Sequence, residues 1–229
     1  MSKLKVLSLN VRGLGSSRKI SQIVHELSLS HYDIIFLQET HVSCKRQADL
    51  FERYWNGKCF SSFGIRKSAG VAVLFSPAFS GKIHFLSDSD GRVLSLLVEL
   101  NSFKFNLVNI YSPNTASDRK TFSTCLHDYF ISQGNLIIGG DFNCIDNAID
   151  KHNCMCVLPM DKNSLCSIKS DFTLVDIWRK QNPLKISYTW SNKDHSQASR
   201  IDRFCIAKSL IPNVLFSDIQ LCLIRPRIY

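Results

Sequence analysis

The chain has 229 residues, of which 45% are hydrophobic and 10% aromatic, so it can bury one large core and is not a disordered or low-complexity chain. Lys and Arg total 28 against 19 Asp and Glu, which gives a formal net charge of +9. A polyanionic partner is consistent with this charge, but the basic residues are spread along the chain, and charge alone does not identify the partner.

Membrane and disulfide classes are not favoured by the sequence. No run of about 18 apolar residues is present, and no small-residue cleavage site follows the short apolar run near the N-terminus, so we expect an intracellular protein without membrane contact. The nine cysteines form no Cys-x-x-Cys pair, which favours reduced thiols. His152, Cys154 and Cys156 are the tightest cluster, but a structural zinc site would need a fourth ligand.

The first half of the chain predicts strands around one helix. Short apolar runs bounded by Gly, Asp, Ser or Asn predict buried strands at residues 5–11, 33–39, 70–76 and 82–88. Between the first two, Ile20, Ile23, Val24 and Leu27 recur at helical spacing, so residues 16–30 are expected to form an amphipathic helix capped by Ser16 or Ser17.

The second half continues with a hairpin, two helices and a further strand. Residues 92–113 read as a β-hairpin with its turn at Asn101 and Ser102. Helices are expected at 117–132 and 163–178, and a strand at 135–143. Hairpins mixed with single helices predict an α/β fold of two mixed sheets packed face to face with helices outside. Because no repeat or linker interrupts the chain, we expect a single domain over residues 1–229.

Polar side chains follow several of the predicted strands at the point where each strand ends. They are Asn10, Gln38, Glu39, Asn109, Tyr111, Asp141 and Asn143. Singly, each is explained by turn preference or a solvated surface. Together they predict a functional rim, because layered folds bring strand ends from distant parts of the sequence to one edge.

The motifs around these residues resemble those of a known superfamily. In chain order they read "LSLNVRGL", "IIFLQETH", "VNIYSPN", "IIGGDFN", "SYTWSN" and "SRIDRF". This set, spanning about residues 4 to 224, resembles the exonuclease/endonuclease/phosphatase superfamily, and within it the apurinic/apyrimidinic-endonuclease-like domain of non-long-terminal-repeat retrotransposon proteins. The resemblance implies a four-layer sandwich and phosphodiester hydrolysis.

The resemblance also implies roles for the central residues. Asp141 is expected to activate the attacking water, and Asn143 to hold that water or a phosphate oxygen. Glu39 is expected to be the main ligand of a Mg²⁺ or Mn²⁺ ion with Asn10 nearby, and Tyr111 to present its phenol to the phosphate. Oxygen ligands suit such a hard cation. If this is so, the Glu39 carboxylate lies within about 10 Å of Asp141.

A second group of residues is expected to meet the DNA or to support the catalytic groups. Lys151 and Thr189 match positions that face the DNA backbone, and Asn114 lies close behind Tyr111. Arg12 replaces an acidic residue of the repair relatives and is expected to meet a phosphate. Asp202 matches an aspartate that orients a catalytic histidine.

That histidine is the main departure from the family pattern. The resemblance implies a last strand that opens with Ser-Asp-His, whereas the histidines of this chain reach only to His195. Residues 215–224 are expected to form the strand before it. We therefore expect a domain that lacks its last strand and hydrolyses DNA poorly, because losing one member of a coupled catalytic set costs roughly 10³-fold in rate. The loop residue His195 is the alternative source of an imidazole.

The expected function is a magnesium-dependent DNA endonuclease that nicks one strand to prime target-site reverse transcription. Its partners would be DNA and the reverse transcriptase domain of an intact parent protein, and its location the nucleus. The alternatives are a non-catalytic, DNA-binding remnant of a retrotransposon and a phosphatase or phosphodiesterase of the same superfamily.

Overall fold

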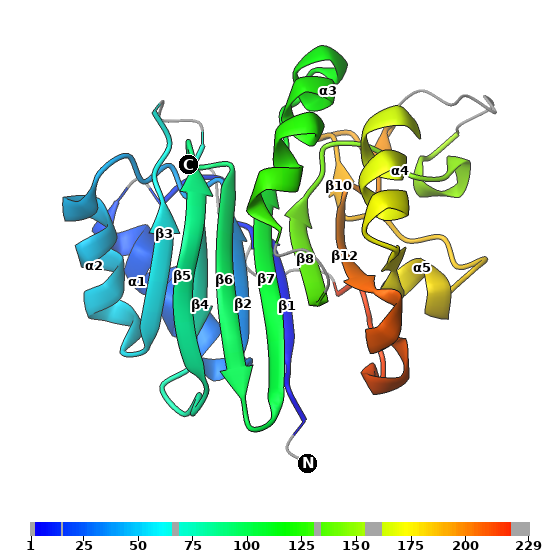
Figure 1. Ribbon diagram of the computed structural model, residues 1–229. Helices are drawn as coiled ribbons and strands as arrows, with labels where there is room; N and C mark the ends of the chain where they lie inside the picture. Colours follow the sequence, from blue (N-terminus) through cyan, green and yellow to red (C-terminus); the bar gives the residue numbers. More distant parts are fainter. Residues whose placement is uncertain (1–2, 15, 66–68, 131–133, 154–161, 221–229) are drawn as a thin grey trace.

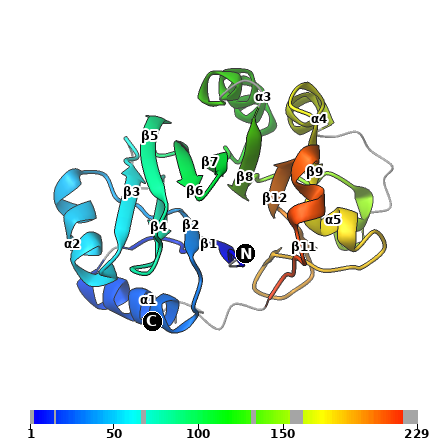
Figure 2. The same ribbon diagram turned by 60° about the horizontal axis from the view of Figure 1, so that its bottom comes forward.

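A computed structural model describes residues 3–14, 16–65, 69–130, 134–153 and 162–220. Two β-sheets pack face to face in the middle of the molecule (Figure 1). Helices α1 (Ser17–Leu29) and α2 (Lys45–Trp55) cover one outer side, and α3 (Ala116–Cys125) and α4 (Lys162–Asp171) cover the opposite side (Figure 2). The α/β four-layer sandwich predicted from the sequence is therefore confirmed.

The smaller sheet carries the first part of the site. It consists, in spatial order, of β1 (Val6–Asn10), β2 (Ile34–Gln38), β4 (Val71–Phe75) and β3 (Lys58–Ser62). β1 and β2 run parallel with Asn10 opposite Gln38. Both strands therefore end at the same edge of the sheet, and Glu39 follows there directly.

The larger sheet carries the second part. It consists, in spatial order, of β5 (Lys82–Ser89), β6 (Val93–Leu100), β7 (Phe103–Tyr111), β8 (Asn135–Asp141), β12 (Asp202–Ala207) and β9 (Leu174–Asp176). Asp141 lies opposite Tyr111 of the parallel strand β7 and opposite Asp202 of the antiparallel strand β12. Three site residues thus stand in one row across adjacent strands.

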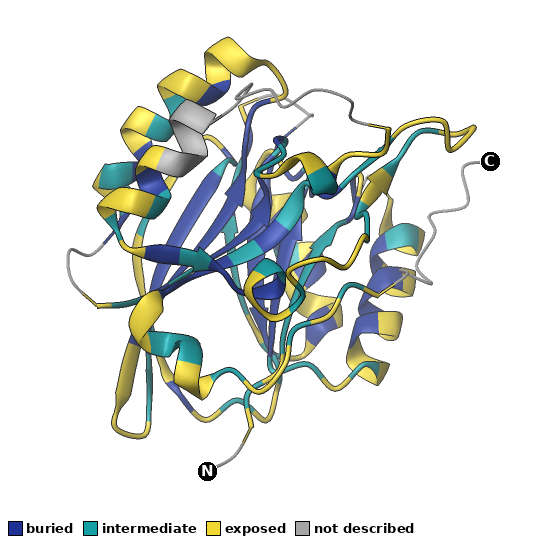
Figure 3. Cartoon of the chain, turned by 90° about the vertical axis from the view of Figure 1, so that its right-hand side faces the viewer, coloured by how far each residue is buried: buried dark blue, intermediate teal, exposed yellow. Residues whose placement is uncertain are grey.

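The core between the sheets is mostly apolar but contains some buried polar side chains. Phe36, Leu96 and Leu107 are fully buried there, and Figure 3 shows the strands as the buried interior. Gln38 and Asn109 are also fully buried. The Asn109 amide nitrogen donates to the backbone oxygens of β2 and β4 in the opposite sheet, and the Gln38 amide donates to Asn109 at 2.8 Å. These two residues therefore join the sheets rather than face a substrate.

The first two helices cover the smaller sheet. α1 (Ser17–Leu29) begins as predicted, because the Ser16 hydroxyl accepts from the Lys19 amide, and it buries the expected apolar face. α2 (Lys45–Trp55) was not predicted, although Ala48, Phe51 and Trp55 are buried at helical spacing. The Trp55 indole donates to the Phe75 backbone oxygen at 2.8 Å and fixes this helix on β4.

Both helices predicted in the second half are wrong in extent. The segment 117–132 forms α3 (Ala116–Cys125) and then a 3₁₀ turn, η1 (Leu126–Tyr129). The segment 163–178 forms α4 (Lys162–Asp171), strand β9 and α5 (Ile177–Gln181). Thr173, at φ +51°, ends the helical path, and residues 174–176 pair instead with β12. Tertiary pairing overrides the local helical period here.

Three other local predictions need correction or addition. β5 is an edge strand with most side chains exposed, not a buried strand, although its bounds match. Residues 214–220 form no strand, and the rest of that predicted strand lies outside the described residues. Strand β3 was not predicted either, nor were the two-stranded hairpin of β10 (Trp190–Ser191) and β11 (Ala198–Ser199) and the 3₁₀ turns η2 (Ala148–Asp150) and η3 (Lys208–Asn213).

The hairpin turn at Asn101 is confirmed, with this residue at φ +55° between β6 and β7. No helix in the described parts of the chain is long and apolar enough to cross a membrane.

Candidate active site

One amide joins two carboxylates from the two sheets. The Asn10 Nδ2 atom donates to Glu39 Oε1 at 2.8 Å and to Asp141 Oδ2 at 3.1 Å. Asn10 ends β1, and Asp141 ends β8 of the facing sheet. The expected closeness of Glu39 and Asp141 is therefore confirmed, since both carboxylates contact the same nitrogen.

The loops that carry these residues need unusual backbone conformations. Glu39 and Asn143 have φ values of +51° and +49°, in the left-handed region. Gly140 has φ +136°, and a Cβ there would lie 2.0 Å from the Ile110 backbone oxygen. Only glycine lets β8 approach β7 so closely one residue before Asp141.

Asn143 fixes the Asp141 carboxylate from the other side. Its backbone amide donates to Asp141 Oδ1 at 2.9 Å, and its side-chain amide donates to the Ser112 backbone oxygen at 2.7 Å. Both oxygens of Asp141 thus accept a hydrogen bond, one from Asn143 and one from Asn10. Burial nevertheless raises the pKa of Asp141, and the Glu39 charge adds to this shift.

Tyr111 and Asp202 flank Asp141 on its two neighbouring strands. Burial is the largest cause that raises the pKa of the Tyr111 phenol. The negative charge of Glu39 and a hydrogen bond to Glu39 raise this pKa further. The phenol is therefore protonated and serves as a donor. Burial beside the Asp141 charge raises the pKa of Asp202 to about 7, and a hydrogen bond from Thr189 opposes the shift.

The residues fit a divalent ion of the magnesium type. Among the described residues, no group of three or more His, Cys, Asp or Glu side chains forms a cage for a metal. Mg²⁺ needs no such cage, because it binds through one or two carboxylates together with waters and substrate phosphates. The Glu39 side chain is 24% exposed, and one of its oxygens lies 4.0 Å from His41 Nε2. It is the carboxylate of this site that best fits such an ion.

Asn10 fits that role less well. Its Oδ1 atom, the only one that could bind a cation, accepts from the Arg12 backbone amide at 3.0 Å. Since this amide can pair only with an oxygen, the Asn10 nitrogen must face the two carboxylates. The arrangement favours Asn10 as the bridge between Glu39 and Asp141.

The predicted DNA contacts differ in exposure. Arg12, Asn114 and Lys151 are exposed. Thr189 is half-buried, and its hydroxyl accepts from the Ile201 and Asp202 amides at 3.0 and 3.1 Å. Thr189 therefore holds the beginning of β12 in place, and a direct contact between its hydroxyl and DNA stays a prediction.

The alternative imidazole and the possible zinc cluster gain no support. His195 is exposed in the β10–β11 hairpin, where its Nδ1 atom lies 3.1 Å from the Ser191 hydroxyl. Among the described residues, the side chains that most affect the pKa of Asp202 are Asp141, Thr189, Arg203 and Glu39. Cys154 and Cys156 lie outside the described residues.

Two cations near the carboxylates were not identified from the sequence. The Arg92 guanidinium lies 5.1 Å from the centre of the Tyr111 ring and donates to the Tyr111 backbone oxygen. The buried Arg203 lowers the pKa of both Asp141 and Asp202, against the effect of burial. Arg203 directly follows Asp202 in "SRIDRF". Its place in β12, the strand that pairs with β8, is the only signal that distinguishes it from a surface arginine.

Comparison with known proteins agrees with this geometry. Residues 7–222 match the Endonuclease/Exonuclease/phosphatase family. The chain belongs to this family. The superfamily indicated by the motifs is therefore confirmed.

One relative and two solved structures illustrate the likeness. The chain is 33% identical over 228 residues to the Transposon TX1 uncharacterized 149 kDa protein of Xenopus laevis, a match that covers 95% of this chain and 17% of that protein. An AP endonuclease from Leishmania major superposes with a TM-score of 0.75 at 18% identity, over 91% of this chain and 80% of the other. The endonuclease domain of TRAS1, a telomere-specific non-LTR retrotransposon, gives 0.63 at 12% identity, over 91% and 86%. These two structures share the fold of this family member.

Proposed function

We propose that this chain is a divalent-metal-dependent DNA endonuclease that hydrolyses one phosphodiester bond in duplex DNA. The observation that carries the proposal is the Asn10 amide, which holds the Glu39 and Asp141 carboxylates together where the ends of both sheets meet. A base beside a cation ligand is what hydrolysis of a phosphodiester requires. Family membership gives the same class of reaction.

Glu39 is the proposed ligand of the ion, with Asn10 orienting it. When bound, Mg²⁺ or Mn²⁺ supplies positive charge that offsets the negative charge developing on the phosphate. The Glu39 carboxylate, whose side chain is 24% exposed, suits that position. The ion and its ligands are part of the proposal.

Asp141, Tyr111 and Asn143 each have a separate proposed role in hydrolysis. Asp141 takes the proton of the attacking water, and its raised pKa brings it closer to neutral pH, where a base works best. The protonated Tyr111 phenol donates to a phosphate oxygen. Asn143 holds the Asp141 carboxylate and contributes its side chain to the water or the phosphate.

DNA is the proposed substrate because the rim is flanked by exposed cations and the net charge is +9. Arg12 and Lys151 are the proposed phosphate contacts, and both are exposed. Asn114 and Thr189 complete this proposed DNA-facing set. The non-catalytic DNA-binding remnant and the phosphatase or phosphodiesterase are the alternatives that the assay below distinguishes.

The biological setting is also proposed from the relatives. Because the 33% identical relative is a transposon protein of which this chain spans 17% of the length, we propose that the endonuclease acts within a longer transposon protein. In that setting its nick would prime reverse transcription by another part of the protein, inside the nucleus. These partners and this location remain proposals.

The test is nicking of supercoiled plasmid in Mg²⁺. We expect Asp141→Ala and Glu39→Gln to lower the rate by roughly 10³-fold or more, as removing members of a catalytic set does in other hydrolases. Glu26→Gln, on the exposed side of α1, is the matched control and should nick at the parent rate. Chelation with EDTA should abolish nicking.

Other outcomes point elsewhere. If the parent chain binds the plasmid without nicking it, the remnant alternative is correct. If it hydrolyses only phosphomonoesters, the phosphatase alternative is correct. We also expect a slow parent rate, because no histidine of the described residues is among the groups that most affect the Asp202 carboxyl. Free imidazole in the buffer should then raise that rate.

A further inference from the structure

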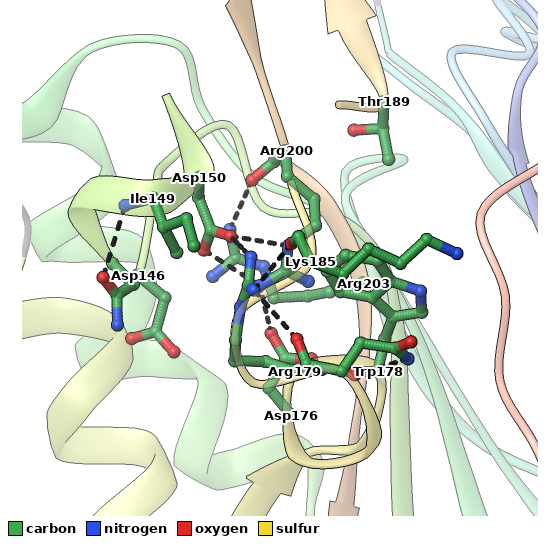
Figure 4. Close-up of polar contacts among 12 residues, drawn as sticks. Asp146, Ile149, Asp150, Asp176, Trp178, Arg179, Lys185, Thr189, Arg200 and Arg203 are labelled. Carbon is green, nitrogen blue, oxygen red and sulfur yellow. Dashed lines mark hydrogen bonds and ion pairs between the residues drawn. The ribbon is translucent and has the colours of Figure 1, made fainter. Parts of the chain in front are cut away.

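A largely buried network of arginine and aspartate side chains lies in the segments next to Lys151 and Asp202 in the sequence, and Figure 4 shows its contacts. Its members are Asp150, Asp176, Arg179, Arg200 and Arg203. Apart from Arg203, whose charge acts on Asp141 and Asp202, none of these residues is assigned a role in the chemistry above. Such a concentration of charge inside a protein is costly unless every partner is placed with good geometry.

Arg200 is the centre of this arginine–aspartate network. It is fully buried, and its Nε and NH2 atoms donate to the two oxygens of Asp150 at 2.8 and 2.9 Å. The same NH2 atom donates to the Asp176 carboxylate at 2.7 Å. The Arg200 backbone amide donates to the backbone oxygen of Asp150 at 2.8 Å. A planar guanidinium in this fork geometry fixes both the distance and the angle between the segments that it joins.

The segments joined in this way carry the flanking site residues. Asp150 immediately precedes Lys151, at the end of the loop that begins with Asp141. Arg200 comes two residues before Asp202. One bidentate contact therefore ties the segment of a proposed phosphate contact to the segment of a proposed catalytic carboxylate.

Two further arginines extend the connection. Arg179 bonds to Asp150 and also donates to the backbone oxygens of residues 182, 183 and 185, in the segment that leads to Thr189. Arg203 donates to the Arg200 backbone oxygen at 2.9 Å and to the Cys144 backbone oxygen, in the loop after Asp141. The network thus contacts three segments: the loop after Asp141, the segment at Asp150, and the segment 182–185 that leads to Thr189.

We propose that Arg200 is a positioning residue, which acts through Asp150 and Asp176 to hold Lys151 and Asp202 at one rim. The proposal rests on the proposed function for its meaning in catalysis. Buried ion pairs are weak contributors to net stability, and an apolar replacement often stabilises a protein. What Arg200 supplies is the relative placement of the segment after η2, which carries Lys151, and the start of β12, which carries Asp202.

The first measurement is plasmid nicking by Arg200→Lys, which keeps the charge but loses the fork. We expect turnover to fall by about 100-fold, as a misplacement of about 1 Å does in other enzymes. In the Asp202→Asn background the same substitution should add little, because residues acting through one another are not additive. A full additional loss in the double variant would overturn the proposal.

The matched control is Lys169→Met. It removes a half-buried ion pair with Asp146, which joins α4 to the same loop but does not reach residues 199–203. We expect this variant to lose stability without the loss of turnover. If it slows nicking as much as Arg200→Lys at equal stability, general destabilisation explains both and the proposal fails.

The second measurement needs no activity. Hydrogen exchange of the free protein should rise at residues 148–152 and 199–203 in Arg200→Lys and stay unchanged there in Lys169→Met. If Arg200→Lys does not fold, Asp176→Asn removes only one of the Arg200 contacts and should give the same pattern more weakly. Unchanged protection of both segments would overturn the proposal. A parent chain that never nicks DNA would refute the proposed function, and exchange would still decide whether Arg200 holds the segments.

Discussion

At the scale of single residues, the site is a set of carboxylates whose charges oppose one another. Glu39, Asp141 and Asp202 all lie within interaction distance, and the Glu39 charge raises the pKa of both aspartates. Asn10 and Arg203 reduce this repulsion through a hydrogen bond and a positive charge respectively. The free protein keeps this arrangement at a cost in stability, and a bound cation would relieve it.

Asp202 makes this cost measurable. Its folded pKa of about 7 lies above the ordinary value of 3.8, so the folded state favours the protonated form. The stability that this preference provides is present at low pH and is lost as pH rises from about 4 to about 7. Asp202→Asn should therefore be more stable than the parent at pH 8 by about 2 kcal/mol, and by much less near pH 4.

Chemical denaturation in EDTA at several pH values checks this prediction. Each comparison is made at one pH, so the titration of other groups cancels between the two proteins. A stability difference that does not change between pH 4 and pH 8 would contradict the assignment of the raised pKa to Asp202.

At the scale of elements, the site depends on how closely β7 and β8 approach each other. Gly140 sits in β8 with φ +136°, and the space beside it is filled by the Ile110 backbone of β7. Because backbone atoms cannot move aside as a flexible side chain can, the residue before Asp141 must be glycine. The pairing of Tyr111 with Asp141 follows from this close approach.

Gly140→Ala tests this constraint. We expect a loss of about 2 kcal/mol or more in the free energy of unfolding, because alanine is strained at this φ and its Cβ meets a carbonyl oxygen. Nicking should fall as well, since Asp141 follows directly. Gly134→Ala is the matched control, because a Cβ there meets nothing within 4 Å. Equal stability of the two variants in thermal or denaturant unfolding would refute the prediction.

At the scale of the whole molecule, the two sheets must keep one register relative to each other, because each supplies part of the site. Asn109 of the larger sheet bonds the Leu37 and Ala72 backbone oxygens at 3.0 and 2.8 Å and accepts from Gln38. All these groups are cut off from water in the middle of an apolar core. A sliding of the sheets would break these hydrogen bonds between buried groups, which is more costly than losing apolar contact alone.

Asn109→Leu should therefore destabilise the fold by about 3 kcal/mol, although leucine is of similar size and more apolar, because it leaves several buried polar groups unsatisfied. The double variant with Gln38→Leu should recover part of this loss, since one of the unpaired groups is removed. Denaturant unfolding of the single and double variants measures both effects. A single variant as stable as the parent would show that these bonds do not hold the sheets.

Local sequence determined much of this protein. The short apolar runs bounded by Gly, Asp, Ser or Asn determined β1, β2, β4 and β8, and the helical spacing of Ile20, Ile23, Val24 and Leu27 determined α1. The ordered set of motifs from "LSLNVRGL" to "SRIDRF", which includes "GGDFN", indicated the family and the closeness of Glu39 and Asp141. These features depend on neighbouring residues or on short motifs, which a single sequence contains in full.

Tertiary structure decided what depends on contacts between distant segments. Residues 174–176 follow a helical pattern but form a strand, because β12 offers them backbone partners. Gln38 and Asn109 look like rim residues in the sequence, yet the facing sheets bury them as a link. Arg200 reads as a surface arginine until Asp150, fifty residues earlier, is brought against it. The physical reason is common to all three: burial and pairing set the energy of a polar group, and both are properties of the folded chain.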